Sequence, residues 1–402
     1  MNPKRRGFLQ AVVGGAAAFS LLASKSLEGA GIVRKVEAIP ARVPYRDTFV
    51  IGRGLVATGG QAGQYVYVRV ETEDGTVGWG ETIALPSWSY ETVDSIVGTV
   101  RNHLARIVTN RSVFDQGWFE RQFDDVLTPA VSQGFPFAKS AVQIATLDAA
   151  GRIAGLPLHR FFGGKLRDKI ALSYALSIDT PEAMARAAQS MPAVQCYKLK
   201  VSGDPKLDVA RLRAVLEARP DVDIWIDANQ SYRPLHLETF CKQVEDIPQV
   251  RCLEQPVKSV DWLGMRRARE RTKIPLAIDE GCFSSYDVAR VARLDVCDLI
   301  VLKVAKSAGM WGCQRSAAVA QAHGLGLLGS GLTEAGIGLA ASAHLYSTIE
   351  LVLAPELNGP KFLADLFVTG LDLKENVVRV PDAGGLGVQV NEEAIRRHSM
   401  RL

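Results

Sequence analysis

From about residue 165 onward, short apolar runs alternate with longer amphipathic stretches at a nearly constant interval. Many of these runs end on a polar residue or a glycine. Seven such end positions lie 24 to 27 residues apart and are Lys200, Asp227, Glu254, Asp279, Lys303, Gly329 and Glu356. One strand, one helix and two loops need about 25 to 30 residues, so each interval corresponds to one β/α unit. One further interval before Lys200 reaches Ser173, which completes a set of eight strands.

Eight β/α units with polar residues at the strand ends predict an α/β fold, a (β/α)8 barrel whose functional site lies at its C-terminal face. An open doubly wound sheet is the alternative, because its spacing is similar. The glycine-rich stretch at residues 52–60 does not have the spacing of a phosphate-binding fingerprint, which favours the barrel.

Two lysines, Lys198 and Lys200, lie two residues apart in one of the expected strands and therefore on the same face of it. Lysines that blunt a solvent-exposed edge strand are one explanation. A central strand of a parallel barrel is covered on both faces, so in that fold both side chains point into the barrel mouth.

The N-terminal part of the chain follows another pattern. Residues 64–81 alternate apolar and polar side chains and turn at Asp74-Gly75, which predicts a β-hairpin. Residues 91–108 and 136–155 show helical apolar spacing. We therefore expect an α+β domain ahead of the barrel.

Residues 1–30 begin with basic residues, carry the pair Arg5-Arg6 and continue into a mildly apolar stretch to about Ala23. This segment resembles a twin-arginine export signal, and its apolar run is short for a membrane span. We expect a periplasmic protein without a stable membrane span after processing. An uncleaved anchor and a cytoplasmic location are the alternatives.

The remaining composition bears on partners and redox state. The chain has 47 basic and 43 acidic residues, a net charge of +4, and part of this excess lies in the first six residues. No basic face for nucleic acid is implied, and we expect a small-molecule carboxylate as substrate and a homo-oligomer. The six cysteines show no C-x-x-C spacing, which predicts buried free thiols and leaves open whether any disulfide forms.

Three successive strands end with Asp227, Glu254 and Asp279. Carboxylates that converge in a confined mouth need a countercharge, and three hard oxygen donors suit Mg²⁺, or Mn²⁺ in its place. Separate loop caps or salt bridges are the alternative. Lys200 and Lys303 lie on strands nearly opposite each other, an arrangement suited to removing a proton from a carbon next to a substrate carboxylate.

These residues occur within motifs that resemble a known family. Lys198-Leu199-Lys200, Asp227-Ala228-Asn229, Glu254-Gln255-Pro256, Asp279-Glu280 and Lys303 match, in order and spacing, the muconate-lactonizing subgroup of the enolase superfamily. G-W-G-E-T at 78–82, L-D-A-A-G-R-I-A-G-L-P-L at 147–158 and E-L-N-G-P at 356–360 extend the resemblance over nearly the whole chain after residue 30.

The resemblance implies roles for these residues. The implied metal ligands are Asp227, Glu254 and Asp279, and the implied acid/base pair is Lys200 and Lys303. Lys198 and Asn229 are implied to support the site electrostatically. Glu280 is implied to contact the metal ligands without binding the metal itself. It also implies a capping domain over 31–160, the barrel over 161–368 and a C-terminal segment over 369–402 that returns to the capping domain.

The expected reaction is metal-dependent removal of the α-proton through an enediolate, giving cycloisomerisation, racemisation or epimerisation. A dehydratase of hydroxy acids or hydroxyprolines is an alternative, and so is a non-catalytic ligand-binding barrel. Because the seventh strand ends with Gly329-Ser330 and not with histidine, the mandelate-racemase and glucarate branches are excluded. The eighth strand carries Glu356-Leu357-Asn358 where dipeptide epimerases carry paired aspartates, which counts against that activity.

Substrate contacts are expected from loops over the barrel mouth, at residues 44–63 and 83–90. The first loop carries Arg46 and Arg53, which suit a lid that holds a second anionic group of the substrate. Two ordinary surface arginines are the alternative. Ser330 and Glu356, at the ends of the seventh and eighth strands, are predicted to bind substrate as well.

Overall fold

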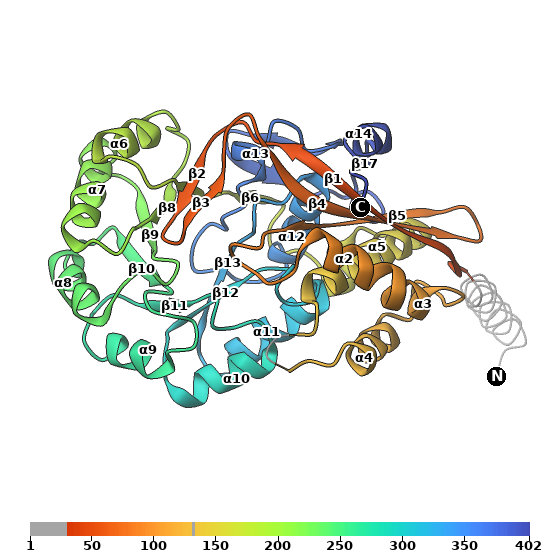
Figure 1. Cartoon of the computed structure of the whole chain (residues 1–402), viewed down its shortest axis with the longest axis horizontal. Helices are drawn as coiled ribbons and strands as arrows, with labels where there is room; N and C mark the ends of the chain where they lie inside the picture. Colours follow the sequence, from red (N-terminus) through yellow and green to blue (C-terminus); the bar gives the residue numbers. More distant parts are fainter. Residues whose placement is uncertain (1–29, 131–132) are drawn as a thin grey trace, which may run out of the picture.

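The computed structural model describes residues 30–130 and 133–402 and shows a barrel with a second α+β unit beside it (Figure 1). The segment expected to direct export therefore lies outside the described residues, apart from residue 30. No helix within the described ranges combines the length and the apolar character needed to cross a membrane. All six cysteines are buried and free, as expected.

The N-terminal unit is built on an antiparallel sheet of β1 (Val33–Pro44), β4 (Ala62–Thr72) and β5 (Val77–Ala84), in the order β1-β4-β5. The β4–β5 hairpin turns around Gly75, which confirms the hairpin predicted there. Helix α5 (Pro136–Ala154) packs against β5 and β4. The smaller helices of this unit are α2 (Val93–Thr99), η1 (Val100–Leu104), α3 (Ala105–Val108) and α4 (Gln116–Val126).

The G-W-G-E motif on β5 has two separate packing reasons. A Cβ atom at Gly80 would lie 1.9 Å from the carbonyl oxygen of Ala141, so α5 rests directly on the backbone of β5. Glu81 points the other way and accepts N–H groups of Ile337 and Gly338, both at 3.1 Å, at the start of α12 (Gly336–Tyr346). This carboxylate thus joins the N-terminal unit to the barrel through a helix N-terminus.

The barrel contains seven parallel strands in consecutive order: β7 (Tyr174–Leu176), β8 (Cys196–Lys200), β9 (Asp223–Asp227), β10 (Val250–Glu254), β11 (Leu276–Ile278), β12 (Leu299–Leu302) and β13 (Gly326–Gly329). The eighth position is reduced to Glu356, which forms single parallel bridges to Ser330 on one side and to Ser173 on the other. These two bridges close the ring, which confirms the eight-fold barrel.

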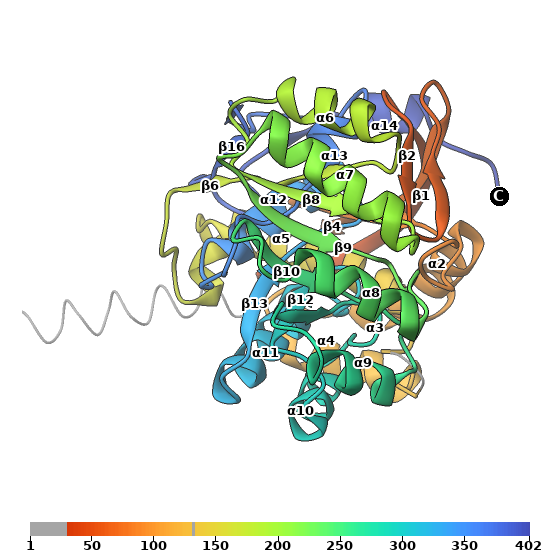
Figure 2. The same ribbon diagram turned by 90° about the vertical axis from the view of Figure 1, so that its left-hand side faces the viewer.

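Helices on the outside of the ring connect the strands. They are α6 (Pro181–Gln189), α7 (Pro205–Ala218), α8 (Pro234–Val244), α9 (Trp262–Arg269), α10 (Ser285–Leu294), α11 (Met310–Ala322) and α12. Figure 2 shows α7, α8 and α9 in front of the strands that they cover. The outward-facing side chains Tyr197, Leu199 and Ile226 belong to the large core between strands and helices.

The inward-facing side chains of the strands form a separate, smaller core. It includes Cys196, Trp225, Cys252 and Val301. On β8 the inward positions after Cys196 are Lys198 and then Lys200, because side chains alternate along a strand. An apolar layer therefore fills the lower barrel, and the charged side chains begin directly above it, at the C-terminal ends.

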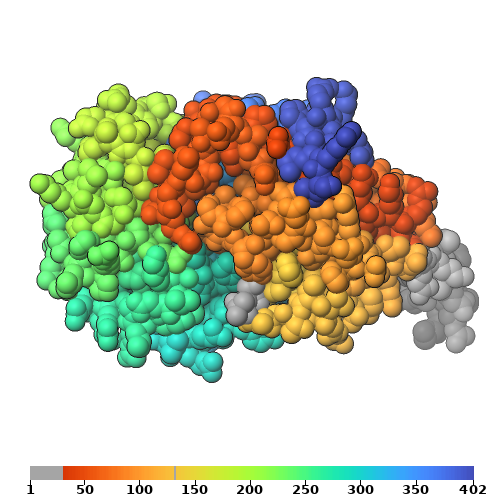
Figure 3. All heavy atoms as spheres, in the orientation of Figure 1, coloured from red at the N-terminus to blue at the C-terminus, as the bar shows by residue number. Residues whose placement is uncertain are grey.

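Two further segments complete the architecture. The hairpin of β2 (Phe49–Ile51) and β3 (Gly54–Ala57) extends from the N-terminal unit over the barrel. After the short helix α13 (Gly359–Phe362), the chain forms β14 (Val368–Thr369), β15 (Leu373–Lys374), β16 (Val377–Arg379), β17 (Gln389–Val390) and α14 (Glu392–Arg397). Helix α14 contacts β1, and in Figure 3 the N-terminal unit (red to orange) lies directly against the barrel (green).

Candidate active site

Buried charged side chains gather at the C-terminal ends of the barrel strands. Lys198 and Lys200 come from β8, Asp227 ends β9 and Glu254 ends β10. Asp279 follows β11, Lys303 follows β12, and Glu356 closes the ring. Each of these residues is at most 5 % exposed. The regular spacing of the β/α units thus brings residues more than 150 positions apart into one buried cluster.

Lys198 lies at the centre of this cluster. Its Nζ is 3.1 Å from Asp227 Oδ2, 3.0 Å from Glu254 Oε2 and 3.4 Å from Glu356 Oε2. The ammonium group also lies 4.4 Å from the ring centroid of Trp225 in the apolar layer below. Burial lowers the pKa of Lys198, but the surrounding carboxylates, Asp227 foremost, hold that pKa well above its ordinary value.

Lys200 pairs with the carboxylate of Asp227 at 2.5 Å and donates to Asn229 Oδ1 at 3.2 Å. Asn229 in turn donates from Nδ2 to Glu280 Oε1 at 3.2 Å. The predicted supporting residues Asn229 and Glu280 are therefore linked to Lys200 in one chain of contacts. Burial raises the pKa of Asp227, but the two lysines outweigh it and bring that pKa to about 2.

On the opposite side, Lys303 pairs with Asp279 Oδ2 at 2.6 Å and lies 4.4 Å from the ring centroid of Trp88. Lys306, which the sequence analysis did not identify, donates to Asp279 Oδ1 at 2.7 Å and to its carbonyl oxygen at 2.8 Å. A second lysine in the otherwise apolar run after Leu302 was the available clue. Lys306 was not predicted because it lies beyond the end of β12, where the alternation of side chains along a strand no longer indicates which way a side chain points.

Glu356 is held by neutral groups as well as by Lys198. Its Oε2 accepts a hydrogen bond from the Ser330 hydroxyl at 2.5 Å, and its Oε1 accepts one from Asn358 Nδ2. Asn358 Oδ1 also accepts the backbone N–H of Ala175 at 3.1 Å. The residues predicted as substrate contacts at the seventh and eighth strands thus bind each other in this structure.

A small cavity of about 40 Å³ lies above the charged cluster. Its roof consists of Phe49, Ile51 and Val56 from the hairpin and Leu85 and Trp88 from the 83–90 segment. The hairpin is docked on the loop after β7, because Val50 N donates to Ser177 Oγ at 2.9 Å and Ile178 N donates to Val50 O at 3.0 Å. This mouth leaves little free space in the structure, so the side chains that line it have to rearrange to admit a substrate.

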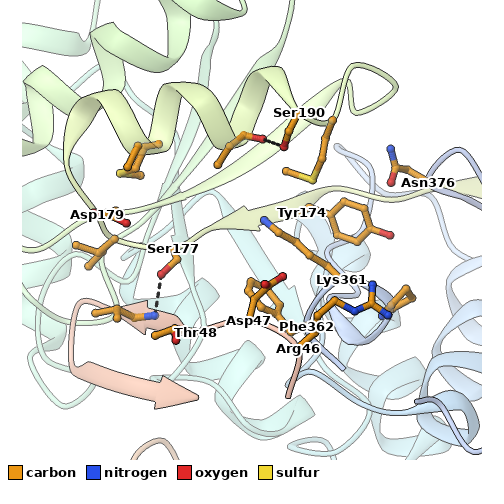
Figure 4. Close-up of a pocket in the computed structure, with 17 residues that line it drawn as sticks. Arg46, Asp47, Thr48, Tyr174, Ser177, Asp179, Ser190, Lys361, Phe362 and Asn376 are labelled. Carbon is orange, nitrogen blue, oxygen red and sulfur yellow. Dashed lines mark hydrogen bonds between the residues drawn. The ribbon is translucent and has the colours of Figure 1, made fainter. Parts of the chain in front are cut away.

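The two arginines predicted to serve this cavity lie elsewhere. Arg46 lines a larger pocket of about 540 Å³, together with Lys361, Tyr174 and Asn376 (Figure 4). That pocket lies on the other face of β2, because Val50 faces it while Phe49 and Ile51 face the barrel mouth. Arg53 is exposed at the turn between β2 and β3. The structure therefore does not bring either arginine to the charged cluster.

The carboxylates of the cluster repel one another where no cation lies between them. Burial and the nearby charge of Asp227 raise the pKa of Glu254 well above its usual range. In the part of the chain that the structure describes, Glu254 Oε2 and Glu280 Oε2 are the buried carboxylate oxygens without a hydrogen-bond donor. Glu254 Oε2 lies near Lys198, but the geometry there does not form a hydrogen bond.

These observations test whether a divalent cation suits the site. Within residues 30–130 and 133–402, no group of three or more histidine, cysteine, aspartate or glutamate side chains is already arranged to hold a metal ion. Lys198 instead lies between Asp227 and Glu254. The donor set nevertheless fits a hard cation, because Asp227, Glu254 and Asp279 offer carboxylate oxygens and one of them carries an unsatisfied buried oxygen.

Fold and site together define a class of protein: a closed (β/α)8 barrel enzyme with its charged cluster at the C-terminal face and a second unit over the mouth. Family comparison agrees. Residues 42–163 match the N-terminal domain of the mandelate racemase/muconate lactonizing enzyme family, and residues 182–394 match the enolase C-terminal domain-like family. The chain belongs to the enolase superfamily, and it is an isomerase of that superfamily.

Individual relatives cover most of the chain. The D-Ala-D/L-Ala epimerase of Cytophaga hutchinsonii is 30% identical over 89% of this chain and 95% of its own. Muconate cycloisomerase 1 of Pseudomonas putida is 28% identical over 84% of this chain and 90% of its own.

Two crystal structures show the same fold. The N-succinyl Arg/Lys racemase of Bacillus cereus superposes with a TM-score of 0.86, at 26% identity over 92% of this chain and 98% of its own. The dipeptide epimerase of Enterococcus faecalis, complexed with Mg and the dipeptide L-Leu-L-Tyr, has a TM-score of 0.82, at 26% identity over 89% of this chain and 99% of its own.

Proposed function

We propose that this protein racemises or epimerises a carboxylic acid at its α-carbon, with Lys200 and Lys303 as the two acid/base groups. The supporting observation is their placement. Counted around the closed ring, β8 is the second strand and β12 the sixth, so the two lysines approach the mouth from opposite sides. Both line the same cavity.

Inversion at carbon needs two groups, one that removes the proton from one face and one that delivers a proton to the other. In this reading, Lys200 removes the α-proton of one enantiomer and Lys303 protonates the opposite face, and the roles exchange for the other enantiomer. Lys198 stays near the substrate carboxylate, where it contributes positive charge. Asn229 stays near Lys200 and orients it.

We further propose that Asp227, Glu254 and Asp279 hold Mg²⁺ or Mn²⁺. A divalent ion at this place supplies positive charge that stabilises the developing negative charge on the substrate carboxylate. Lys198 has to withdraw from Asp227 or Glu254 for both to serve as ligands. Burial lowers the pKa of Lys303, but pairing with Asp279 raises it above its ordinary value. When Asp279 has another cationic partner, the pKa of Lys303 falls and more of this lysine is in the neutral form that can accept a proton.

The metal assignment is tested by chelation and by Glu254→Gln. We expect excess chelator to abolish turnover and Mg²⁺ to restore it, and Glu254→Gln to weaken Mg²⁺ binding measured by calorimetry, because one anionic ligand is lost. Glu217→Gln, on the exposed face of α7, is the matched control. Full turnover in excess chelator would contradict the assignment.

The two-lysine proposal is tested by isotope exchange in D₂O. A panel of muconate, N-acyl amino acids, dipeptides, proline betaines and hydroxyprolines is incubated with the protein, and α-deuterium is followed by NMR. We expect Lys200→Met and Lys303→Met to lose inversion while each still exchanges one enantiomer, and Lys206→Met, at an exposed position, to behave as wild type.

Other outcomes point to other reactions. A cycloisomerase or dehydratase working chiefly through one lysine would convert its substrate without needing the second as an acid or base. If no acid exchanges while the folded protein still binds ligands, the two lysines do not act as a base pair and the proposal is wrong.

A further inference from the structure

The pocket of about 540 Å³ behind β2, which we call the outer pocket, lies on the face of that strand turned away from the barrel mouth (Figure 4). Its lining includes the polar side chains Arg46, Tyr174 and Lys361 and an apolar wall. We infer that the outer pocket is a second ligand site, separate from the barrel mouth, and that it binds a small monocarboxylate with an apolar body.

Two hydrogen bonds hold the three polar groups of this pocket in one frame. The backbone N–H of Arg46 donates to the carbonyl oxygen of Phe362 at 2.7 Å, next to Lys361 in the sequence. Lys361 Nζ donates to the carbonyl oxygen of Ala175 at 2.7 Å, and Ala175 directly follows Tyr174. None of the three polar residues belongs to β2 or β3, so their placement does not depend on the hairpin at the mouth.

These groups offer more hydrogen-bond donors than the described part of the chain accepts. An ammonium group has three N–H donors, and the carbonyl oxygen of Ala175 is the one acceptor that Lys361 has among the described residues. Neither Lys361 nor Arg46 forms an ion pair with a described residue. Tyr174 is 5 % exposed, and its hydroxyl group has no hydrogen-bond partner within the same ranges. A carboxylate, which only accepts hydrogen bonds, satisfies this surplus.

The electrostatics of the pocket favour a single negative charge. Burial lowers the pKa of Lys361 to about 8, although the charges of Asp47 and Glu356 oppose this shift. The positive charge is therefore poorly compensated, and an anion bound beside Lys361 stabilises it. Asp47 and Asp179 also line the pocket and repel a second negative charge. One carboxylate suits the pocket better than a phosphate dianion does.

The apolar wall gives the ligand its second requirement. It comes from α6 and the segments on either side of it, and its members are Ile178, Ala183, Met184, Ala187 and Met191. A hydrocarbon chain that covers this wall removes apolar surface from water on both partners. Methionine side chains are flexible and adapt to chains of different shape.

The test compares three ligands by isothermal titration calorimetry with the wild-type protein: 4-methylpentanoate, its neutral amide and inorganic phosphate. The acid and the amide have nearly the same shape, so the difference between them reports the contribution of the charge. We expect the acid to bind with a Kd of about 1 mM or tighter. The amide and phosphate should bind at least about 10-fold more weakly, because a hydrogen bond to a charged group contributes on that scale and a dianion is repelled by Asp47.

Two variants test the assigned groups. Lys361→Met and Tyr174→Phe should each weaken binding of the acid by about 10-fold or more. Lys206→Met and Tyr286→Phe, at exposed positions outside the pocket, are the matched controls and should bind as the wild type does. Tyr174→Phe removes a single oxygen atom, so the test stays decisive even if Lys361→Met does not fold.

The barrel mouth can also take a carboxylate, and Lys303→Met separates the two sites. We expect this variant to keep the binding that Lys361→Met loses. The opposite pattern would place the acid at the mouth and overturn the inference. An amide or phosphate that binds as tightly as the acid would overturn it too, as would an absence of binding at about 10 mM acid. The α-exchange experiments test the proposed function separately, because none of these outcomes depends on turnover.

Discussion

Gly52 at the tip of the β2–β3 hairpin offers a direct test of whether the hairpin works as the lid of this site. A Cβ atom at residue 52 would lie 2.3 Å from the carbonyl oxygen of Ala228 and 2.9 Å from that of Val201. Both carbonyls follow the ends of β9 and β8, so the hairpin backbone rests directly on the catalytic face of the barrel.

Carbon and oxygen atoms in folded proteins approach to about 3.3 Å, so Gly52→Ala must displace the tip by about 1 Å. The displacement moves Phe49 and Ile51 away from the lysines and lets water reach the charged cluster. A misplacement of about 1 Å can cost on the order of 100-fold in rate, which corresponds to about 2.7 kcal/mol of transition-state stabilisation. We expect kcat/KM for α-exchange to fall by 10- to 100-fold, with little change in the free energy of unfolding.

The assay is α-deuterium exchange with the best acid of the panel, combined with limited proteolysis of the hairpin. Gly117→Ala is the control, because a Cβ atom there meets no atom within 4 Å. Leu55→Ala controls for changes to the hairpin itself, since Leu55 is 59 % exposed. Wild-type kcat/KM in Gly52→Ala would refute the claim that the docked hairpin is needed for catalysis.

Two other predictions concern stability and location. Nδ1 of the buried His344 accepts the backbone N–H of His159 at 3.3 Å, and burial lowers the pKa of His344 to about 4. Because this pKa lies below that of the unfolded chain, the stability linked to His344 is present above about pH 6.5 and is lost toward pH 4, by up to about 3 kcal/mol. Urea unfolding of His344→Asn should show a flatter pH dependence in that window, and the exposed His236→Asn should not. We also propose export through the twin-arginine route: exchanging Arg5 and Arg6 for lysine should leave precursor in the cytoplasm, and full-length wild-type protein found only in the cytoplasm would count against it.

The barrel could be predicted from the sequence because its determinants are local. A β/α unit has a nearly fixed length, so the intervals from Lys200 to Glu356 follow from the geometry of one strand and one helix. The alternation of a strand likewise placed Lys198 and Lys200 on one face before any contact was known. The convergence of the carboxylates at the C-terminal ends followed from parallel strand order alone.

Other features depend on contacts between distant parts of the chain. No periodicity gives the direction of Lys306, which lies in a turn after β12 and reaches Asp279 at the end of the neighbouring strand β11. Arg46 and Arg53 were expected at the barrel mouth because they lie in the loop at residues 44–63. The docking of β2 instead turns Arg46 toward the outer pocket and leaves Arg53 exposed.

The same holds for close backbone approaches. Gly52 and Gly80 are glycines because backbone carbonyls of other elements occupy the space of their side chains, Ala228 in one case and Ala141 in the other. A local sequence pattern carries no information about which distant carbonyl will lie there. Strand length, helix length and the strand face on which each side chain lies are thus set within each segment of the sequence. The ion pairs, the position of the hairpin and the apolar roof arise only where segments meet, because these features depend on distances that tertiary packing alone determines.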